Sequence, residues 1–161
     1  MTSEMRTIQR SSRIGLYGAV AIIVLAAVAY SCLWHPSPSY TFRRWALVLG
    51  TILAVLSVSI VLLTVRKRIP MLRQSDSFRA KLTGYAVHVR SVYLSMLGVV
   101  CVICALTVAS RNSVLFMLAI VCTLVLILNF PNMYRIKVDL GLNDAEMHIL
   151  FGDKYTAGNE H

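Results

Sequence analysis

Hydrophobic residues gather in four long runs, separated by short polar or proline-containing segments. Each run approaches the roughly 20 residues that an α-helix needs to cross the apolar core of a bilayer. In hydrocarbon the backbone has to satisfy its own hydrogen bonds, so each run is expected to be helical. The pattern predicts an all-α integral membrane protein, a four-helix transmembrane bundle of two hairpins. The predicted spans are residues 14–34, 45–65, 92–110 and 114–130.

Turn-forming residues mark the ends of these spans. Pro70 argues against a long continuation of the second span, because proline lacks the backbone N–H and clashes with the preceding helical turn. Only residues 111–113 separate the third and fourth spans, which predicts a tight helical hairpin. Pro131 marks the end of the fourth span or a kink in it.

The composition agrees with a membrane protein. Hydrophobic residues make up 57% of the 161 residues and charged residues 14%, whereas soluble domains average roughly 45–50% and 25%. Four spans use about half of this length and leave no segment long enough for a separate soluble domain of typical size. Most soluble enzyme folds are thereby excluded.

Basic residues decide the expected orientation. Of the 16 Lys and Arg residues, 13 lie before the first span, between the second and third, or after the fourth. By the positive-inside rule, both termini face the cytoplasm of a bacterial inner (plasma) membrane. The cytoplasmic parts are then the N-terminus 1–13, the basic loop 66–91 and the acidic tail 131–161. A cleaved signal peptide ending near Ala29 is the alternative for the first span, although its apolar run exceeds the usual length.

Two cytoplasmic segments have helical patterns of their own. From Phe78 to Val89 hydrophobic residues recur at three- or four-residue steps, which predicts that the third helix begins near Ser77 and extends into the cytoplasm. Residues 142–152 predict a short C-terminal amphipathic helix that starts after Asn143, with two acids in its first turn.

These two segments are the expected interaction surface, because they share one side of the membrane and have opposite charge. The surface consists of Arg66, Lys67, Arg68, Arg73, Arg79, Lys81, Asp144 and Glu146. Anionic lipid headgroups are expected around the basic residues, and a membrane-protein partner or a second copy of the chain is expected as well. Nucleic acid is not expected, since no binding motif accompanies the bases.

Small residues at four-residue spacing allow helix backbones to approach closely in lipid. The expected helix-packing positions are Gly15, Ala19, Ala46, Gly50, Ala54, Ser95 and Gly98.

One motif suggests a redox function. Cys101 and Cys104 form a CxxC inside the third span, the spacing of dithiol redox centres. The run 101–107 resembles the CxxC segment of the vitamin K epoxide reductase family, also a small helical membrane fold, and the resemblance implies a redox pair there. The loop cysteine pair of that family has no counterpart in this sequence. Thiolates are disfavoured in an apolar medium, so packing is the preferred interpretation of both cysteines.

The expected function follows from what the spans lack. They contain no Asp, Glu, Lys, Arg or His of the kind that transporters use, and the chain has no visible nucleotide-binding loop or catalytic triad. We therefore expect a non-enzymatic accessory or scaffold subunit of a membrane complex, with no catalytic residue, metal or cofactor. The alternatives are a membrane thiol-redox enzyme using Cys101 and Cys104, and a small transporter subunit for an uncharged substrate.

Overall fold

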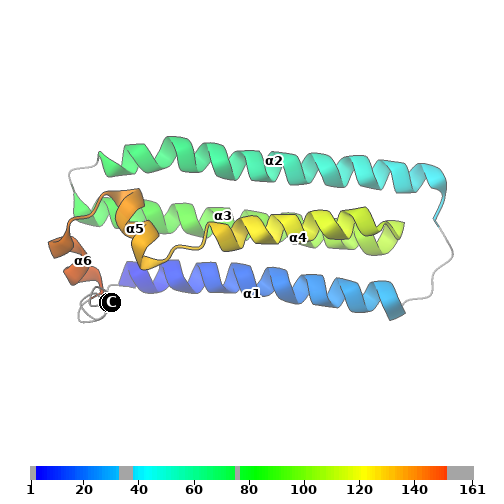
Figure 1. Ribbon diagram of the computed structural model, residues 1–161, viewed down its shortest axis with the longest axis horizontal. Helices are drawn as coiled ribbons and strands as arrows, with labels where there is room; N and C mark the ends of the chain where they lie inside the picture. The colour runs from blue at the N-terminus through cyan, green and yellow to red at the C-terminus, as the bar shows by residue number, and fades with distance from the viewer. Residues whose placement is uncertain (1–2, 33–37, 75–76, 152–161) are drawn as a thin grey trace.

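Four long helices lie side by side, and successive helices run in opposite directions (Figure 1). The computed structural model describes residues 3–32, 38–74 and 77–151, and these contain no strand. The long helices are α1 (Ser3–Cys32), α2 (Tyr40–Arg73), α3 (Phe78–Ser110) and α4 (Ser113–Leu128). Two short helices, α5 (Met133–Leu140) and α6 (Asp144–Phe151), lie at the end of the molecule where α1 begins (Figure 1). We call this the α5 end.

In the described part of the chain, three helices, α1, α2 and α3, are long and apolar enough to cross a membrane. The pair α4 and α5 passes the same test only when taken together, and it is bent by 74°. The prediction of an all-helical membrane protein is confirmed at this level, with three or four helices able to span.

Helix α2 is longer than the predicted span 45–65, because it continues through Pro70 to Arg73. The helix runs through Pro70, but no long continuation follows the proline, as expected. The proline stands in the last turn, so little helix follows it, and its carbonyl still accepts a hydrogen bond from the Gln74 N–H at 3.3 Å. The segment expected as the basic loop 66–91 is therefore mostly helical, and only residues 74–77 join α2 to α3.

Helix α3 follows its prediction, since it begins after Ser77 and runs unbroken to Ser110. The turn after it is as tight as expected. Arg111 adopts the left-handed conformation with φ 50°, and the Asn112 side chain accepts a hydrogen bond from the Val114 N–H at 3.0 Å, which caps α4.

The expected kink at Pro131 is the break between α4 and α5. Helix α5 itself was not predicted. The Asn132 side chain caps it by accepting from the Arg135 N–H at 2.7 Å, and Gly141 ends it with φ 61°. Ile136 and Leu140, four residues apart, are the buried positions of this helix.

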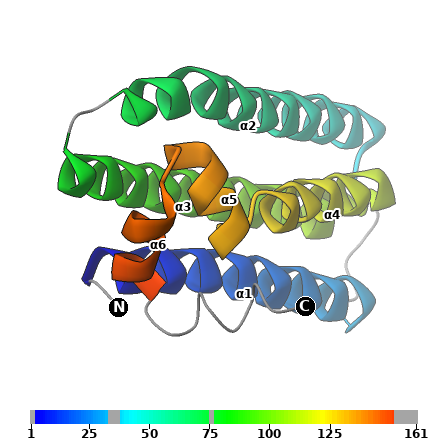
Figure 2. The ribbon, with the colours of Figure 1, turned by 60° about the vertical axis from the view of Figure 1, so that its left-hand side comes forward.

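The predicted C-terminal helix is α6. The Asn143 side chain accepts from the Glu146 N–H at 2.8 Å, while the Glu146 carboxylate accepts from the Asn143 N–H at 3.0 Å. This reciprocal pair is a capping box. Met147 and Leu150 are buried in the same apolar cluster as Met5 of α1, and α6 lies beside the first turns of α1 (Figure 2). The Arg68 and Asp144 side chains lie outside the described part of the structure.

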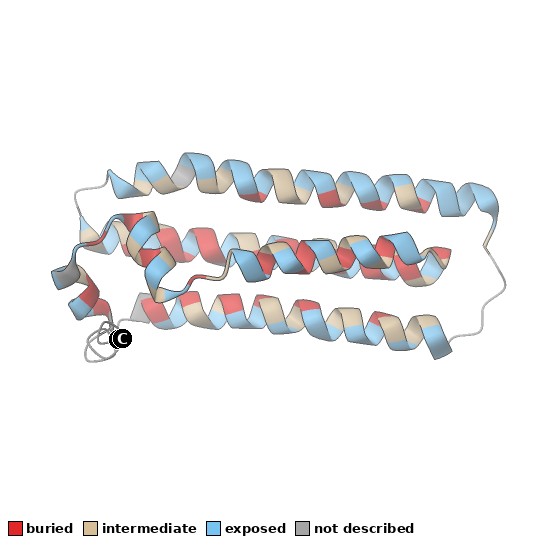
Figure 3. Ribbon diagram, viewed as in Figure 1, coloured by how far each residue is buried: buried red, intermediate tan, exposed pale blue. Residues whose placement is uncertain are grey.

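Helix α3 is the centre of the molecule, because it contacts α1, α2 and α4. Buried positions lie mainly on the inward helix faces, and exposed positions cover the outer face of α2 (Figure 3). Exposed side chains on that face include Ile52, Leu56 and Leu63, as expected for a surface that contacts lipid.

Two of the glycines proposed for packing, Gly15 and Gly50, lie at close helix contacts. A Cβ on Gly15 would stand 2.8 Å from the Cβ of Tyr93, and a Cβ on Gly50 would clash with the Leu115 side chain. The remaining alanines proposed for packing, Ala19, Ala46 and Ala54, are all buried. By contrast, Ser95 is exposed, and a Cβ on Gly98 would meet nothing within 4 Å. The stripe of small residues on α3 therefore does not face another described helix at these two positions.

Candidate functional site

Polar side chains gather around a small cavity at the α5 end. We call them the polar cluster: Tyr85, His88 and Tyr93 of α3, Asn129 just after α4, and Arg135 and Asp139 of α5. Valine and isoleucine side chains of α2 and α3 line the rest of the cavity. Its volume of about 30 Å³ is about that of one water molecule.

Helix α5 supplies the charged pair of the polar cluster. Arg135 and Asp139 are four residues apart, so they share one face of the helix. The Arg135 Nε lies 3.7 Å from the Asp139 Oδ2, and the two side chains are 31% and 15% exposed. The same Oδ2 accepts a hydrogen bond from the Tyr85 hydroxyl at 3.0 Å. Asp139 therefore joins α5 to α3.

Arg135 also joins α5 to the end of α4 across the bend. Its guanidinium donates to the Leu128 carbonyl and, at 2.7 Å, to the Asn129 side-chain oxygen. The last carbonyls of a helix have no partner within the helix and carry the negative end of its dipole. The guanidinium satisfies one of them, and this fixes its place at the cavity.

Tyr93 connects the polar cluster to the core. Its side chain is 2% exposed, and its hydroxyl donates to the Leu126 carbonyl of α4 at 2.9 Å. Gly15 of α1 lies directly against the tyrosine side chain. The small residue on α1 thus makes room for the tyrosine that holds α3 and α4 together beside the site.

The chemistry of the polar cluster suits an oxyanion. A guanidinium offers five N–H donors in a planar fork that matches phosphate and carboxylate, and Tyr85 and His88 add groups that form hydrogen bonds. From residue 5 to residue 138 the sequence contains a single acid, Asp76, so Asp139 is a rare negative charge in this part of the chain. Among the described residues, no group of three or more His, Cys, Asp or Glu could hold a metal ion.

The residues expected from the sequence lie elsewhere. Cys101 is exposed and Cys104 buried, and both line an open groove of about 560 Å³ between α1 and α3. All the other residues of that groove are apolar. The structure does not bring these cysteines to the polar cluster.

The basic residues expected as an interaction surface are mostly exposed on α2 and α3. The exposed ones are Arg66, Lys67, Arg73 and Arg79, whereas Lys81 is half-buried. Arg73 lies against the α5 C-terminus, because a Cβ on Gly141 would clash with its side chain. Glu146 on α6 is half-buried within its capping box.

Sequence reasoning missed the entire polar cluster. The available signals were the four-residue spacing of Arg135 and Asp139 between a capping Asn132 and Gly141, which marks a short amphipathic helix. A second signal was that Tyr85 and His88 lie among the apolar positions of α3. Polar side chains on a buried helix face indicate a candidate functional site.

The sequence profile of the family described as Cobalamin-5-phosphate synthase matches residues 2–139 of the chain. The match includes α1 to α4 and the polar cluster, and it ends at Asp139 within α5. No curated protein and no solved structure matches the chain. The matched family is one of enzymes of cobalamin biosynthesis. The expectation of a non-enzymatic accessory or scaffold subunit is therefore wrong, and so are the thiol-redox and transporter alternatives.

Proposed function

The chain belongs to the cobalamin-5-phosphate synthase family, and from that premise we propose that it is a membrane enzyme that forms cobalamin 5-phosphate. The observation that carries the proposal is the match itself, which covers most of the 161 residues. The whole polar cluster falls inside the matched segment. An accidental likeness of apolar helices would not account for the phosphate-compatible groups that the segment contains.

Arg135 is the residue that binds the phosphate in this proposal. A phosphate ester is an oxyanion, and the arginine fork binds such groups with two parallel, charge-assisted hydrogen bonds. Asp139 acts as a positioning residue, because its carboxylate contacts both the Arg135 guanidinium and the Tyr85 hydroxyl. Tyr85, whose hydroxyl proton is donated to Asp139, holds that carboxylate in place from α3.

The cavity has to enlarge before it takes up this ligand. A volume of about 30 Å³ holds about one water molecule, which is too little for a phosphate ester. Helix α5 follows a 74° bend at Pro131, and Arg135 holds it to α4 through Leu128 and Asn129. We propose that the phosphate replaces these two partners and that α5 moves outward about the bend.

The proposed topology places the polar cluster at the cytoplasmic face of a bacterial inner membrane. The support is the distribution of Lys and Arg, of which 13 of 16 lie before the first predicted span, between the second and third, or after the fourth. In this arrangement α4, followed by α5, completes a fourth crossing. The exposed basic residues Arg66, Lys67 and Arg79 then face anionic lipid headgroups.

Complementation tests the proposed function. The chain is expressed in a bacterial strain whose own cobalamin-5-phosphate synthase gene is deleted, and cobalamin is measured in cell extracts by mass spectrometry. Restored cobalamin supports the proposal. If the chain reaches the membrane and yields no cobalamin, the proposed function is wrong.

Three variants in the same strain test the site. Arg135→Gln removes the fork, and we expect cobalamin to fall by at least about tenfold, since a charge-assisted hydrogen bond contributes about 1.5–3 kcal/mol. Asp139→Asn should reduce it as well, because Arg135 and Tyr85 lose their common partner. Lys137→Gln is the matched control, a charge removed from the same helix outside the polar cluster. Equal cobalamin from all three would place the phosphate elsewhere and leave the family function standing.

A further inference from the structure

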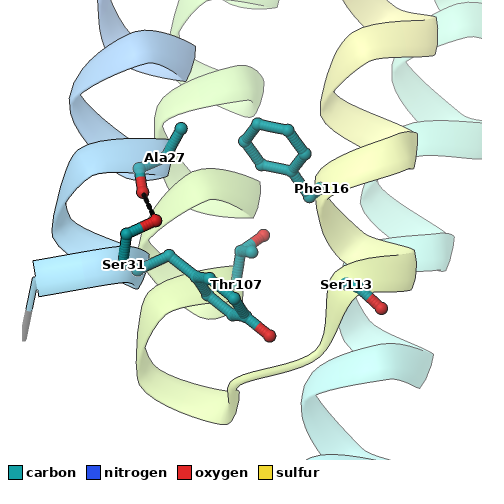
Figure 4. Close-up of a pocket in the computed structure, with 6 residues that line it drawn as sticks. Ala27, Ser31, Thr107, Ser113 and Phe116 are labelled. Carbon is teal, nitrogen blue, oxygen red and sulfur yellow. Dashed lines mark hydrogen bonds between the residues drawn. The ribbon is translucent and has the colours of Figure 1, made fainter. Parts of the chain in front are cut away.

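A second and larger cavity lies at the opposite end of the helices, where α1 ends, α3 ends and α4 begins (Figure 4). Its volume is about 240 Å³. It is lined by Ala27, Tyr30 and Ser31 of α1, Thr107 of α3, and Ser113 and Phe116 of α4. Parts of α1, α3 and α4 therefore border one space, outside the polar cluster.

The interior of this cavity suits an apolar chain. The Ser31 hydroxyl donates to the Ala27 carbonyl at 2.9 Å, and the Thr107 hydroxyl donates to the Ile103 carbonyl at 2.8 Å. Both hydroxyl protons are thus used within their own helices. Tyr30 of α1 and Phe116 of α4 supply aromatic surface. A charged group would lose hydration here without gaining a strong partner.

Charge is present at the edge of the cavity instead. The Arg111 guanidinium lies over the Tyr30 ring, 5.5 Å from its centre, and donates to the Tyr30 carbonyl at 3.4 Å. Arg111 also has a positive φ of 50°, a conformation that glycine or asparagine adopts at lower cost. Strained backbone of this kind occurs most often at functional sites.

The sequence offers no acid near this end of the molecule. No Asp or Glu occurs from residue 5 to 75 or from residue 77 to 138. Arg43, Arg44 and Arg111 all lie at this end and carry positive charge. The phosphate groups of anionic lipid headgroups carry the opposite charge.

We propose that this cavity binds one glycerophospholipid. The headgroup phosphate contacts the Arg111 guanidinium, and part of an acyl chain lies between Tyr30 and Phe116. The neighbouring surface supports a lipid as the occupant, because Val28, Val114 and Met117 expose more than half of their area beside the cavity. The proposal is independent of the enzyme reaction at the polar cluster.

Native mass spectrometry of the purified chain tests it. Phosphatidylglycerol is added to the detergent-solubilised protein, and the ratio of lipid-bound to lipid-free chain is measured. In Arg111→Gly the turn keeps its positive φ without strain, and we expect the ratio to fall by about tenfold. Arg44→Ala is the matched control: Arg44 lies over the Tyr40 ring at 5.6 Å, does not line this cavity, and should leave the ratio within about twofold.

A second variant keeps the test decisive if Arg111→Gly fails to fold. Ala27→Phe fills the cavity from α1 and retains the arginine, and we expect it to lose the bound lipid while keeping its helical circular dichroism. A diacylglycerol with the same acyl chains should bind about tenfold more weakly than phosphatidylglycerol. The proposal would be overturned if Ala27→Phe retained the bound lipid. It would also be overturned if Arg111→Gly and Arg44→Ala retained equal amounts of lipid. Displacement of the lipid by millimolar inorganic phosphate would also overturn it, in favour of a simple anion site.

Discussion

Replacing Tyr93 by phenylalanine removes one buried hydroxyl beside the polar cluster and leaves the ring in place. Tyr93 is 2% exposed, and its hydroxyl donates to the Leu126 carbonyl at 2.9 Å. Just after α4, the Phe130 N–H donates to the Ile127 carbonyl at 3.0 Å instead of to the Leu126 carbonyl. The backbone amide that would normally reach Leu126 is therefore used elsewhere, and Tyr93→Phe leaves this carbonyl without its hydroxyl donor.

The expected cost follows from that geometry. A buried acceptor left without a donor costs about 1–3 kcal/mol, while side-chain hydrogen bonds in membrane proteins contribute up to about 1.7 kcal/mol. Since the ring is unchanged, no cavity adds to the loss. We expect Tyr93→Phe to lower the free energy of unfolding by about 1–2 kcal/mol.

Unfolding by SDS in mixed micelles, followed by far-UV circular dichroism, measures this difference. Tyr17→Phe is the matched control, because Tyr17 is 69% exposed and its change should stay within about 0.5 kcal/mol. Equal unfolding free energies for the two variants would refute the assigned role of the Tyr93 hydroxyl.

Three further changes test the packing and the helix ends. Gly15→Leu places a side chain against Tyr93 and should cost about 1–3 kcal/mol in the same titration; wild-type stability would contradict the close contact of α1 with α3. Gly98→Ala meets open space, so it should be neutral or stabilise by up to about 1 kcal/mol, and a loss would show that α3 has a neighbour there. Asn143→Ala removes the capping box of α6 and should weaken that helix by about 1 kcal/mol, seen as faster amide exchange in α6 with unchanged global unfolding; unchanged exchange would contradict the cap.

The membrane fold was predictable because its signals are local. Long apolar runs, the three-residue turn at Arg111 and the cap at Asn143 are each read from consecutive residues. Pro70 marked the approaching end of α2, which stops within one turn after it, but the apolar run did not show that the helix continues beyond residue 65. Helix α5 has the same length as the predicted α6, and it was missed because Arg135, Lys137 and Asp139 interrupt its apolar residues.

The candidate site could not be predicted from local patterns. Tyr85 and Asp139 are 54 residues apart in sequence, and they meet because the chain bends sharply between α4 and α5. Cys101 and Cys104 drew attention through a motif that is local, yet they lie on an open apolar groove. The family match indicated that the chain is an enzyme. The sequence analysis did not find this, because it recognised no known catalytic motif.

Equilibrium binding of cobalamin 5-phosphate to the chain in lipid nanodiscs tests the central claim most directly, with cobalamin that lacks this phosphate as the comparison. The account predicts that the phosphorylated form binds at least about tenfold more tightly, and that Arg135→Gln abolishes most of this preference while Lys137→Gln preserves it. Equal affinity for the two forms, or binding of neither, would contradict a phosphate site at the polar cluster.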